Sequence, residues 1–263
     1  MENVNDIRDI VSKLIWLYES KNYKKVIRTF KKNKSILINN ADALNILGAT
    51  YVALDKQAEA LKSYKKALLV DGQHSDTLNN LGILFFNSGD YNQAIQFYNE
   101  AKNIGFENRN ILNNLGNAYR ALGQFQNAIE SYSAALELDP NAADIWKSKI
   151  NTLFEKREFE EALNQLKIFS STFQDPTFTY QVTSDCALAL EYFDLALENL
   201  LQLEKFIKPD WTVKNNIGLC FLKLTNVRNA KENFKASILI YKKNPNANFN
   251  LGLCYFEEKK FKK

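Results

Sequence analysis

A leucine–glycine pair recurs along this chain at a constant spacing of 34 residues. Residues 47–48, 81–82 and 115–116 carry it, and Ile217-Gly218 and Leu251-Gly252 continue the same register without insertion or deletion. Self-similarity at one fixed period is typical of proteins built from stacked supersecondary units. The period therefore predicts a solenoid, and it constrains the fold more than any other feature of the sequence.

The repeating units span residues 7–40, 41–74, 75–108, 109–142, 143–176, 177–210 and 211–244, and a partial eighth spans 245–263. Within a unit, apolar residues recur at positions 4, 7, 8 and 11 and again at positions 20, 24 and 27. Such spacings place side chains on one face of a helix. Each unit is therefore predicted to form two amphipathic helices, and we expect a single array over residues 1–263.

One unit, residues 109–142, shows the pattern most completely, through Leu112, Leu115, Gly116, Tyr119, Ala128, Tyr132, Ala135 and Pro140. These residues resemble the tetratricopeptide repeat, whose pattern is W-x2-L-G-x2-Y, then A-x3-F, then P. The resemblance covers essentially the whole chain. It implies an all-α fold, a right-handed superhelical solenoid of helix-turn-helix tetratricopeptide repeats, in which the first helix of each repeat lines a concave groove. It also implies a protein–protein interaction scaffold that binds an extended peptide or a partner protein there.

Three units depart from the pattern at the glycine position. Leu14 and Ile150 occupy this position in the first and fifth units, and Thr183-Ser184 replaces the leucine–glycine pair in the sixth. A bulky side chain there is expected to push the paired helices apart. We therefore expect local irregularity around residues 143–210. Gly89 and Gly123 lie between the two predicted helices of their units, where they suit a tight turn.

Bulk composition excludes several classes of function. The net charge of +4 over 263 residues is too small for the basic footprint of a nucleic-acid-binding domain. No apolar run approaches the roughly 18–20 residues that span a membrane, and the N-terminus lacks the apolar core of a signal peptide. Three cysteines, an odd number, do not suggest a disulfide framework. We therefore expect a cytoplasmic protein with no nucleic-acid partner and no membrane insertion.

The sequence offers no catalytic constellation, so we expect no enzyme activity. His74 is the only histidine, and we expect it to be exposed at the junction of two units. A single histidine excludes catalytic triads and multi-histidine metal sites. Cys186, Cys220 and Cys254 all occupy position 10 of their units, where other units carry small or apolar residues. They are therefore predicted to be buried structural thiols, and neither a metal nor a cofactor is expected.

Asparagine supplies the one pattern that points to a function. It occurs 32 times, and it fills position 5 in four units and position 6 in four units. Position 5 holds Asn45, Asn79, Asn113 and Asn215, and position 6 holds Asn80, Asn114, Asn216 and Asn250. Asparagine is a poor residue inside a helix, so chance should place fewer of them there. Asn117 and Asn151, at position 9, lie one turn further along the same helical face.

The position 6 row is similar to the asparagine ladder in the repeat domain of O-linked N-acetylglucosamine transferase. That resemblance implies that Asn80, Asn114, Asn216 and Asn250 contact the backbone of an extended peptide. A side-chain amide both donates and accepts hydrogen bonds, as a peptide bond does. The other interpretation is that the row bonds the backbone of the neighbouring repeat or water. Ser12, Ile46, Ser148 and Val182 interrupt the row in the other units.

Two further interpretations stay open. The basic run Lys21, Lys24, Lys25, Arg28, Lys31, Lys32 and Lys34 is either a solvated cap of the first unit or an anionic contact. The alternative function is a substrate-recruiting arm of a larger enzyme, for example a glycosyltransferase, whose catalytic domain is absent from this chain. Self-association through the ends of the array is also possible for such a solenoid.

Overall fold

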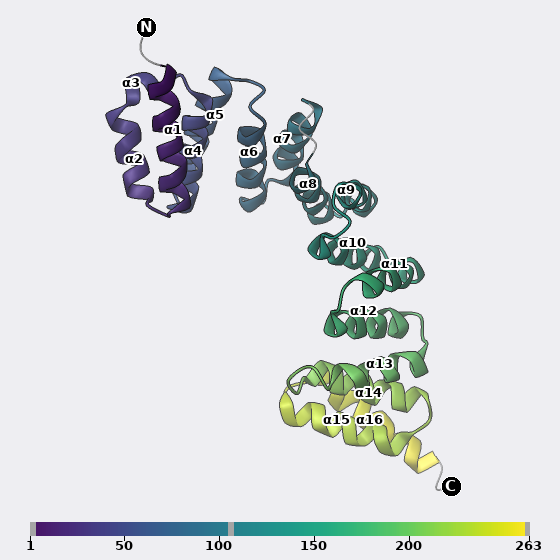
Figure 1. Ribbon diagram of the computed structural model, residues 1–263. Coiled ribbons are helices and arrows are strands. Elements are labelled where there is room, and N and C mark those ends of the chain that lie inside the picture. Colours follow the sequence, from purple (N-terminus) through teal and green to yellow (C-terminus); the bar gives the residue numbers. More distant parts are fainter. Residues whose placement is uncertain (1–3, 105–107, 261–263) are drawn as a thin grey trace. The chain divides into compact units, whose positions relative to one another are not determined.

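The computed structural model describes residues 4–104 and 108–260, and within these ranges all regular secondary structure is helical (Figure 1). The chain packs into two compact units, Met1–Ile145 and Trp146–Lys263. Helices contact mainly their neighbours along the chain, such as α4 with α5, α6 with α7 and α14 with α15. The prediction of an all-α, helical-repeat solenoid is therefore confirmed.

The first compact unit contains the helices of the first four repeats. They are α1 (Val4–Glu19), α2 (Tyr23–Lys32), α3 (Lys34–Leu37), α4 (Ala41–Ala53), α5 (Gln57–Val70), α6 (Ser75–Asn87), α7 (Tyr91–Asn103), α8 (Arg109–Ala121) and α9 (Phe125–Leu138). Helix α10 (Ala143–Glu155) crosses from this unit into the next.

The second compact unit continues with α11 (Phe159–Thr172), α12 (Pro176–Ala189), α13 (Phe193–Leu203), α14 (Trp211–Lys223), α15 (Val227–Ile240) and α16 (Pro245–Lys260). Helix α13 has 11 residues, whereas α11 and α15 have 14 each. The second helix of the sixth repeat thus ends early, inside the region where the sequence departs from the pattern.

In the second, third, fourth and seventh repeats, the core is a glycine on the first helix facing an aromatic ring on the second. A Cβ atom added to Gly116 would lie 2.6 Å from Tyr132 Cε1, and one added to Gly218 would lie 2.7 Å from Phe234 Cε1. The absence of a side chain lets the two helices approach closely, and the ring fills the remaining space. In the fifth repeat Ile150 replaces the glycine and Leu166, rather than an aromatic residue, occupies the ring position; both are buried.

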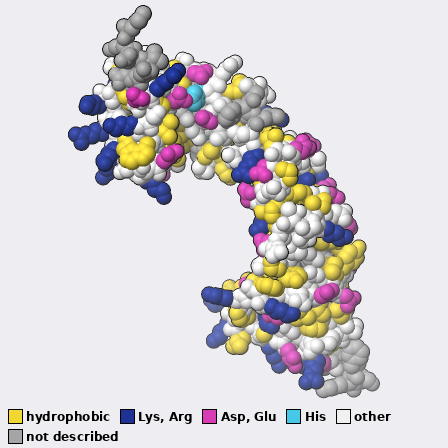
Figure 2. Space-filling view, viewed as in Figure 1, with side chains coloured by type: hydrophobic (Ala, Val, Ile, Leu, Met, Phe, Trp, Pro, Cys, Tyr) yellow, Lys and Arg dark blue, Asp and Glu magenta, His cyan; other side chains and the backbone are white. Residues whose placement is uncertain are grey.

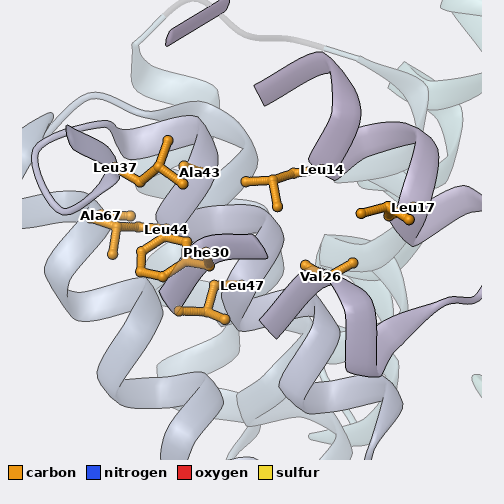
Figure 3. Close-up of a cluster of buried hydrophobic side chains, with 9 residues drawn as sticks. All are labelled: Leu14, Leu17, Val26, Phe30, Leu37, Ala43, Leu44, Leu47 and Ala67. Carbon is orange, nitrogen blue, oxygen red and sulfur yellow. The ribbon is translucent and has the colours of Figure 1, made fainter. Parts of the chain in front are cut away.

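Aliphatic side chains complete this packing at the N-terminal end of the first compact unit. Figure 3 shows Leu14, Leu17, Val26, Phe30, Leu37, Ala43, Leu44, Leu47 and Ala67 converging from several helices. Leu14, at the glycine position of the first repeat, is fully buried in this cluster together with Phe30 at the ring position. The first repeat therefore accommodates two large side chains where the second, third, fourth and seventh repeats combine a glycine with a ring.

Every turn between the two helices of a repeat uses a left-handed residue at position 15. Gly89 and Gly123 fill it with φ of +84° and +72°. The other five repeats place Lys21, Asp55, Arg157, Glu191 and Thr225 there, with φ between +56° and +68°. Glycine adopts this conformation without steric cost, whereas a residue with a Cβ atom is strained. The sequence indicated this turn only where it carries glycine.

The last residue of a unit commonly caps the first helix of the next. Asn40, Asn108 and Asn244 each accept a hydrogen bond from the backbone N–H three residues later. A side-chain oxygen at this place satisfies one of the unpaired N–H groups of the first helical turn. Helix capping therefore explains part of the high asparagine content.

His74 caps α6 in the same way, and the prediction that it is exposed is wrong. Its side chain is only 12% exposed. Nδ1 accepts a hydrogen bond from the Thr77 backbone N–H at 3.2 Å, and Nε2 lies 3.0 Å from Asp42 Oδ1 on α4, the first helix of the repeat that His74 ends. The ring is covered because it joins the first helices of two repeats. The sequence alone does not show these two contacts.

Candidate functional site

The first helices of consecutive repeats contact one another directly within each compact unit. Helix α4 contacts α6, α6 contacts α8, and α14 contacts α16. We call the surface that these helices share the first-helix face. The candidate asparagines lie on these helices, except Asn151, which lies on α10.

Asparagines on the first-helix face pair from one repeat to the next. Asn80 Nδ2 donates to Asn45 Oδ1 at 2.9 Å, and Asn114 Nδ2 donates to Asn79 Oδ1 at 3.2 Å. In the second compact unit, Asn250 Nδ2 donates to Asn215 Oδ1 at 3.4 Å. Each bond joins position 6 of one repeat to position 5 of the repeat before it. Six of the eight asparagines in the two sequence rows therefore form inter-repeat pairs, and Asn113 and Asn216 lie outside these three bonds.

These pairs still carry hydrogen-bonding capacity toward a ligand. An asparagine amide has two donor hydrogens and an oxygen that accepts two bonds. Asn80 uses one donor and Asn45 one acceptor in their bond, and both side chains are only half-buried. Because each amide is fixed by its partner, its remaining donor and acceptor have a defined direction. A fixed polar group loses less conformational entropy on binding than a free one.

The remaining candidate asparagines have other surroundings. Asn117 Oδ1 accepts a hydrogen bond from the Tyr132 hydroxyl at 2.7 Å, so it anchors the ring that packs on Gly116. Asn215 is buried and donates to Asn216 Oδ1 at the long distance of 3.5 Å. Asn113 and Asn151 are half-buried.

Lysine and carboxylate groups near the candidate residues form structural pairs. Lys147 Nζ donates to Asp175 Oδ2 at 2.6 Å, and Asp175 Oδ1 caps α12 by accepting from the Phe178 backbone N–H. The hydrogen bond from Lys147, followed by that from Phe178, lowers the pKa of the Asp175 carboxyl. The ion pair of Lys147 with Asp175 therefore stabilises the junction between the fifth and sixth repeats.

The three thiols are buried, as predicted from their shared position. Cys186, Cys220 and Cys254 are unpaired and fully covered. Burial raises the pKa of Cys186 to about 12 and that of Cys220 to about 11, and it also raises the pKa of Cys254. Since the thiolate is the reactive form, these groups are poor nucleophiles and poor metal ligands.

No metal-binding geometry occurs in the described part of the chain: no group of three His, Cys, Asp or Glu side chains there could hold an ion. Every buried side-chain nitrogen or oxygen in the same residues has a hydrogen-bond partner. The candidate site therefore consists of the asparagine side chains on the first helices.

Family models of the tetratricopeptide repeat match residues 36–105 and residues 110–142. The chain contains tetratricopeptide repeats. Tetratricopeptide-repeat proteins act in general as protein-interaction scaffolds, and the helix pairs described above are their structural unit. No curated protein sequence matches the chain significantly.

Several solved structures share the fold of this chain. The pilF protein of Pseudomonas aeruginosa matches with a TM-score of 0.63 and 21% identity, over 77% of this chain and 92% of its own. A tetratricopeptide repeat protein from Parabacteroides merdae matches with a TM-score of 0.61 and 17% identity, over 94% and 98%. A chain of the Naa15/Naa10 complex bound to HypK-THB matches with a TM-score of 0.62 and 16% identity, over 94% and 38%. At these identities the likeness concerns the fold.

Helices that could span a bilayer are absent from the described residues of this tetratricopeptide-repeat protein, since none is both long and apolar enough.

Proposed function

We propose that this tetratricopeptide-repeat protein binds an extended peptide segment of a partner protein along the first-helix face of its second, third and fourth repeats. The observation that carries the proposal is the recurrence of half-buried asparagine pairs, Asn45 with Asn80 and Asn79 with Asn114, on that face. Amide groups at a regular spacing can bond a peptide backbone whatever its side chains are. The partner then needs an extended conformation more than a particular sequence.

The pairs also have a structural role, because each one joins two repeats. Their second role is to bond the peptide backbone through the donors and acceptors that the pairs do not use. Solved structures such as the Cut9–Hcn1 hetero-tetramer, with a TM-score of 0.55, and the Naa15/Naa10 complex are assemblies of several proteins, which supports a protein partner in general terms. The recruiting arm of a larger enzyme, the alternative drawn from the sequence, gains no support from these comparisons.

Peptides selected from a random-sequence library on the immobilised wild-type protein would test the proposal. Their affinity is then measured for the double variant Asn80→Ala/Asn114→Ala. A matched control, Asn92→Ala/Asn127→Ala, removes two exposed asparagines from the second helices of the third and fourth repeats. Loss of about two hydrogen bonds of ~0.5–1.5 kcal/mol each predicts roughly ten- to hundredfold weaker binding for the first variant only. Equal affinity of the two double variants would contradict the proposal.

A further inference from the structure

The charge of the chain is concentrated in its first repeat. Residues 20–41 contain seven basic and no acidic residues, whereas the whole chain has a net charge of +4. The rest of the sequence is therefore net acidic, at 4 − 7 = −3. All seven basic side chains are exposed. Figure 2 shows dark blue lysine and arginine side chains gathered over the N-terminal helices.

Part of this charge borders a groove between the second helices of the first two repeats. Its floor is apolar and includes Phe30, Leu44 and Leu47, which Figure 3 shows close together, with Ile38 and Tyr51 at its sides. The groove has a volume of about 290 Å³. That is at the lower end of the ~300–1,000 Å³ of small-molecule sites, so it suits one large side chain better than a cofactor.

The rim of this groove is basic from both sides. Lys31 and Lys34 border it from the first repeat, and Lys62 and Lys66 border it from α5. Glu59 is the one acidic residue among those that line it. We call this site, with its apolar floor and its four lysines, the basic groove. Both the floor and the rim combine residues of the first and second repeats, so the groove forms only when these repeats stack.

The same groove recurs two repeats later with a different charge. Leu112, Leu115 and Tyr119 replace Leu44, Leu47 and Tyr51 at equivalent positions of a cavity of about 210 Å³. Its rim carries Asn99 where Lys31 lies, and Glu130 where Lys62 lies. Only Lys102, equivalent to Lys34, keeps the positive charge. We call this second cavity the neutral groove. The cavity thus occurs at two equivalent repeat junctions, and only one of them carries the four lysines.

We propose that the basic groove binds an acidic peptide segment of a partner protein, which inserts one apolar side chain between the lysines. The apolar floor takes the inserted side chain out of water, which supplies affinity roughly in proportion to the area buried. Carboxylates on either side of that residue lie against the lysines, which complements the charge of the rim. No asparagine of the pairs on the first-helix face lines this groove, so the two proposed sites are independent.

The geometry favours a peptide over a polyphosphate chain. Glu59 on the rim would repel a continuous row of phosphates, whereas an acidic peptide can place an uncharged residue opposite it. Phe30 is only 5% exposed, so its ring offers no face on which a nucleobase could stack. An aliphatic and aromatic floor instead fits a leucine or phenylalanine side chain.

The probe for a test is a short fluorescent peptide in which aspartate and glutamate residues flank one phenylalanine. We expect it to bind the wild-type protein and to bind more weakly as the salt concentration rises. A companion peptide with alanine in place of the phenylalanine should bind clearly less well, because it cannot fill the apolar floor. Equal binding of the two peptides would show a diffuse charge effect and would overturn the proposal, as would no binding of the first peptide.

Two variants with the same change at equivalent positions locate the binding. Lys34→Glu reverses a charge of the basic groove, and Lys102→Glu reverses the equivalent charge of the neutral groove. We expect about three- to tenfold weaker binding of the peptide for Lys34→Glu and no change for Lys102→Glu. Equal losses for both variants would overturn the assignment, and so would tighter binding of a single-stranded RNA oligonucleotide or of phosphatidylserine vesicles than of the peptide.

Discussion

The backbone of Gly82 lies against the ring of Tyr98, so closely that a Cβ atom at residue 82 would come within 2.5 Å of Tyr98 Cδ1. The two residues lie on the paired helices α6 and α7 of one repeat. Gly252 occupies the same position of the last repeat, and there a Cβ atom would meet nothing within 4 Å. The glycine is thus required by its partner ring and not by the backbone of its helix.

Gly82→Ala should therefore destabilise the protein, although alanine is intrinsically the better helix former. The added methyl group forces the ring or the helix to move, which typically costs ~1–3 kcal/mol. Gly252→Ala is the matched control, and it should be neutral or stabilising by about 0.5–1 kcal/mol because that glycine is exposed inside a helix. Denaturant unfolding followed by circular dichroism measures both. Equal effects of the two substitutions would show that the ring does not decide the choice of residue.

Thr225 holds a left-handed conformation, with φ of +63°, that glycine holds at the equivalent Gly89. A β-branched residue is strained in this region by about 1–2 kcal/mol or more. Thr225→Gly relieves that strain but increases the entropy of the unfolded chain, by ~0.4–1 kcal/mol. We expect a net stabilisation of about 0.5–1 kcal/mol, visible as a raised melting temperature. Gly89→Ala should lower it, and a lower value for Thr225→Gly would contradict the strain argument.

The thiols should react slowly in the folded protein. Burial raises the pKa of Cys186 to about 12 and that of Cys220 to about 11, from an ordinary value of 9.0. The raised pKa keeps the thiolate fraction small, and burial keeps the sulfur atoms away from the solvent. A thiol reagent should therefore label these cysteines quickly only in denaturant. Cys254 should be the fastest of the three, because the last repeat contacts a neighbour on one side and can fray. Fast labelling of all three residues under native conditions would contradict their structural role.

The same pKa shifts predict a loss of stability in alkali. Below pH 9 the thiols are protonated in both the folded and the unfolded chain, so their full contribution is present. Above pH 9 the unfolded chain ionises first, and the contribution falls as the pH rises toward about 12 for Cys186. Cys186→Ala removes this titration, although it also leaves a small cavity. The alkaline slope of its unfolding free energy should therefore be shallower than that of the wild type.

Acid should weaken the junction that Asp175 forms with Lys147. Because the pKa of Asp175 is lowered from 3.8, its contribution is complete above the unfolded value and disappears as the pH falls through the folded value. Asp175→Asn keeps a good helix cap but removes the charge. Both partners are about a third exposed, so the difference should be at most ~1 kcal/mol at neutral pH. Unfolding free energies measured from neutral to acidic pH should converge for wild type and variant, and a constant difference would contradict this assignment.

The 34-residue period predicted the fold because all repeats share one helical register, whereas features that join two repeats were harder to foresee. His74 was misjudged because its partners, Asp42 and Thr77, lie on two different helices. The left-handed turn was visible only at Gly89 and Gly123, since the strained residues elsewhere share no side-chain chemistry.

The candidate site was predicted by residue type but not by geometry. The two asparagine rows were treated separately, and their pairing at an offset of 35 residues, as between Asn45 and Asn80, was missed. That offset was present in the sequence, since a contact between adjacent repeats links positions that differ by about one period. The basic groove had only a partial signal, because the basic run contains Lys31 and Lys34, whereas Lys62 and Lys66 join them from α5 only when the repeats stack.

Asn45 and Asn80 should be coupled energetically, because they share a hydrogen bond of 2.9 Å between two repeats. In a double-mutant cycle with alanine, we expect a coupling of ~0.5–1.5 kcal/mol in the free energy of unfolding. Asn215 and Asn250, at 3.4 Å, form the comparison pair and should couple more weakly. The cycle isolates the bond from the gain in helix propensity that each alanine brings.

Repeating the cycle with the affinity for a library-selected peptide separates the two roles of the pair. If Asn45 and Asn80 only join repeats, each alanine should lower stability and leave the affinity unchanged once the protein is fully folded. If they also bond the peptide backbone, Asn80→Ala should weaken binding by about tenfold even well below the melting temperature. Asn92→Ala, on the second helix of the same repeat as Asn80, should change neither quantity by more than ~0.5 kcal/mol. An affinity that follows only the folded fraction would leave the asparagine pairs with a structural role alone.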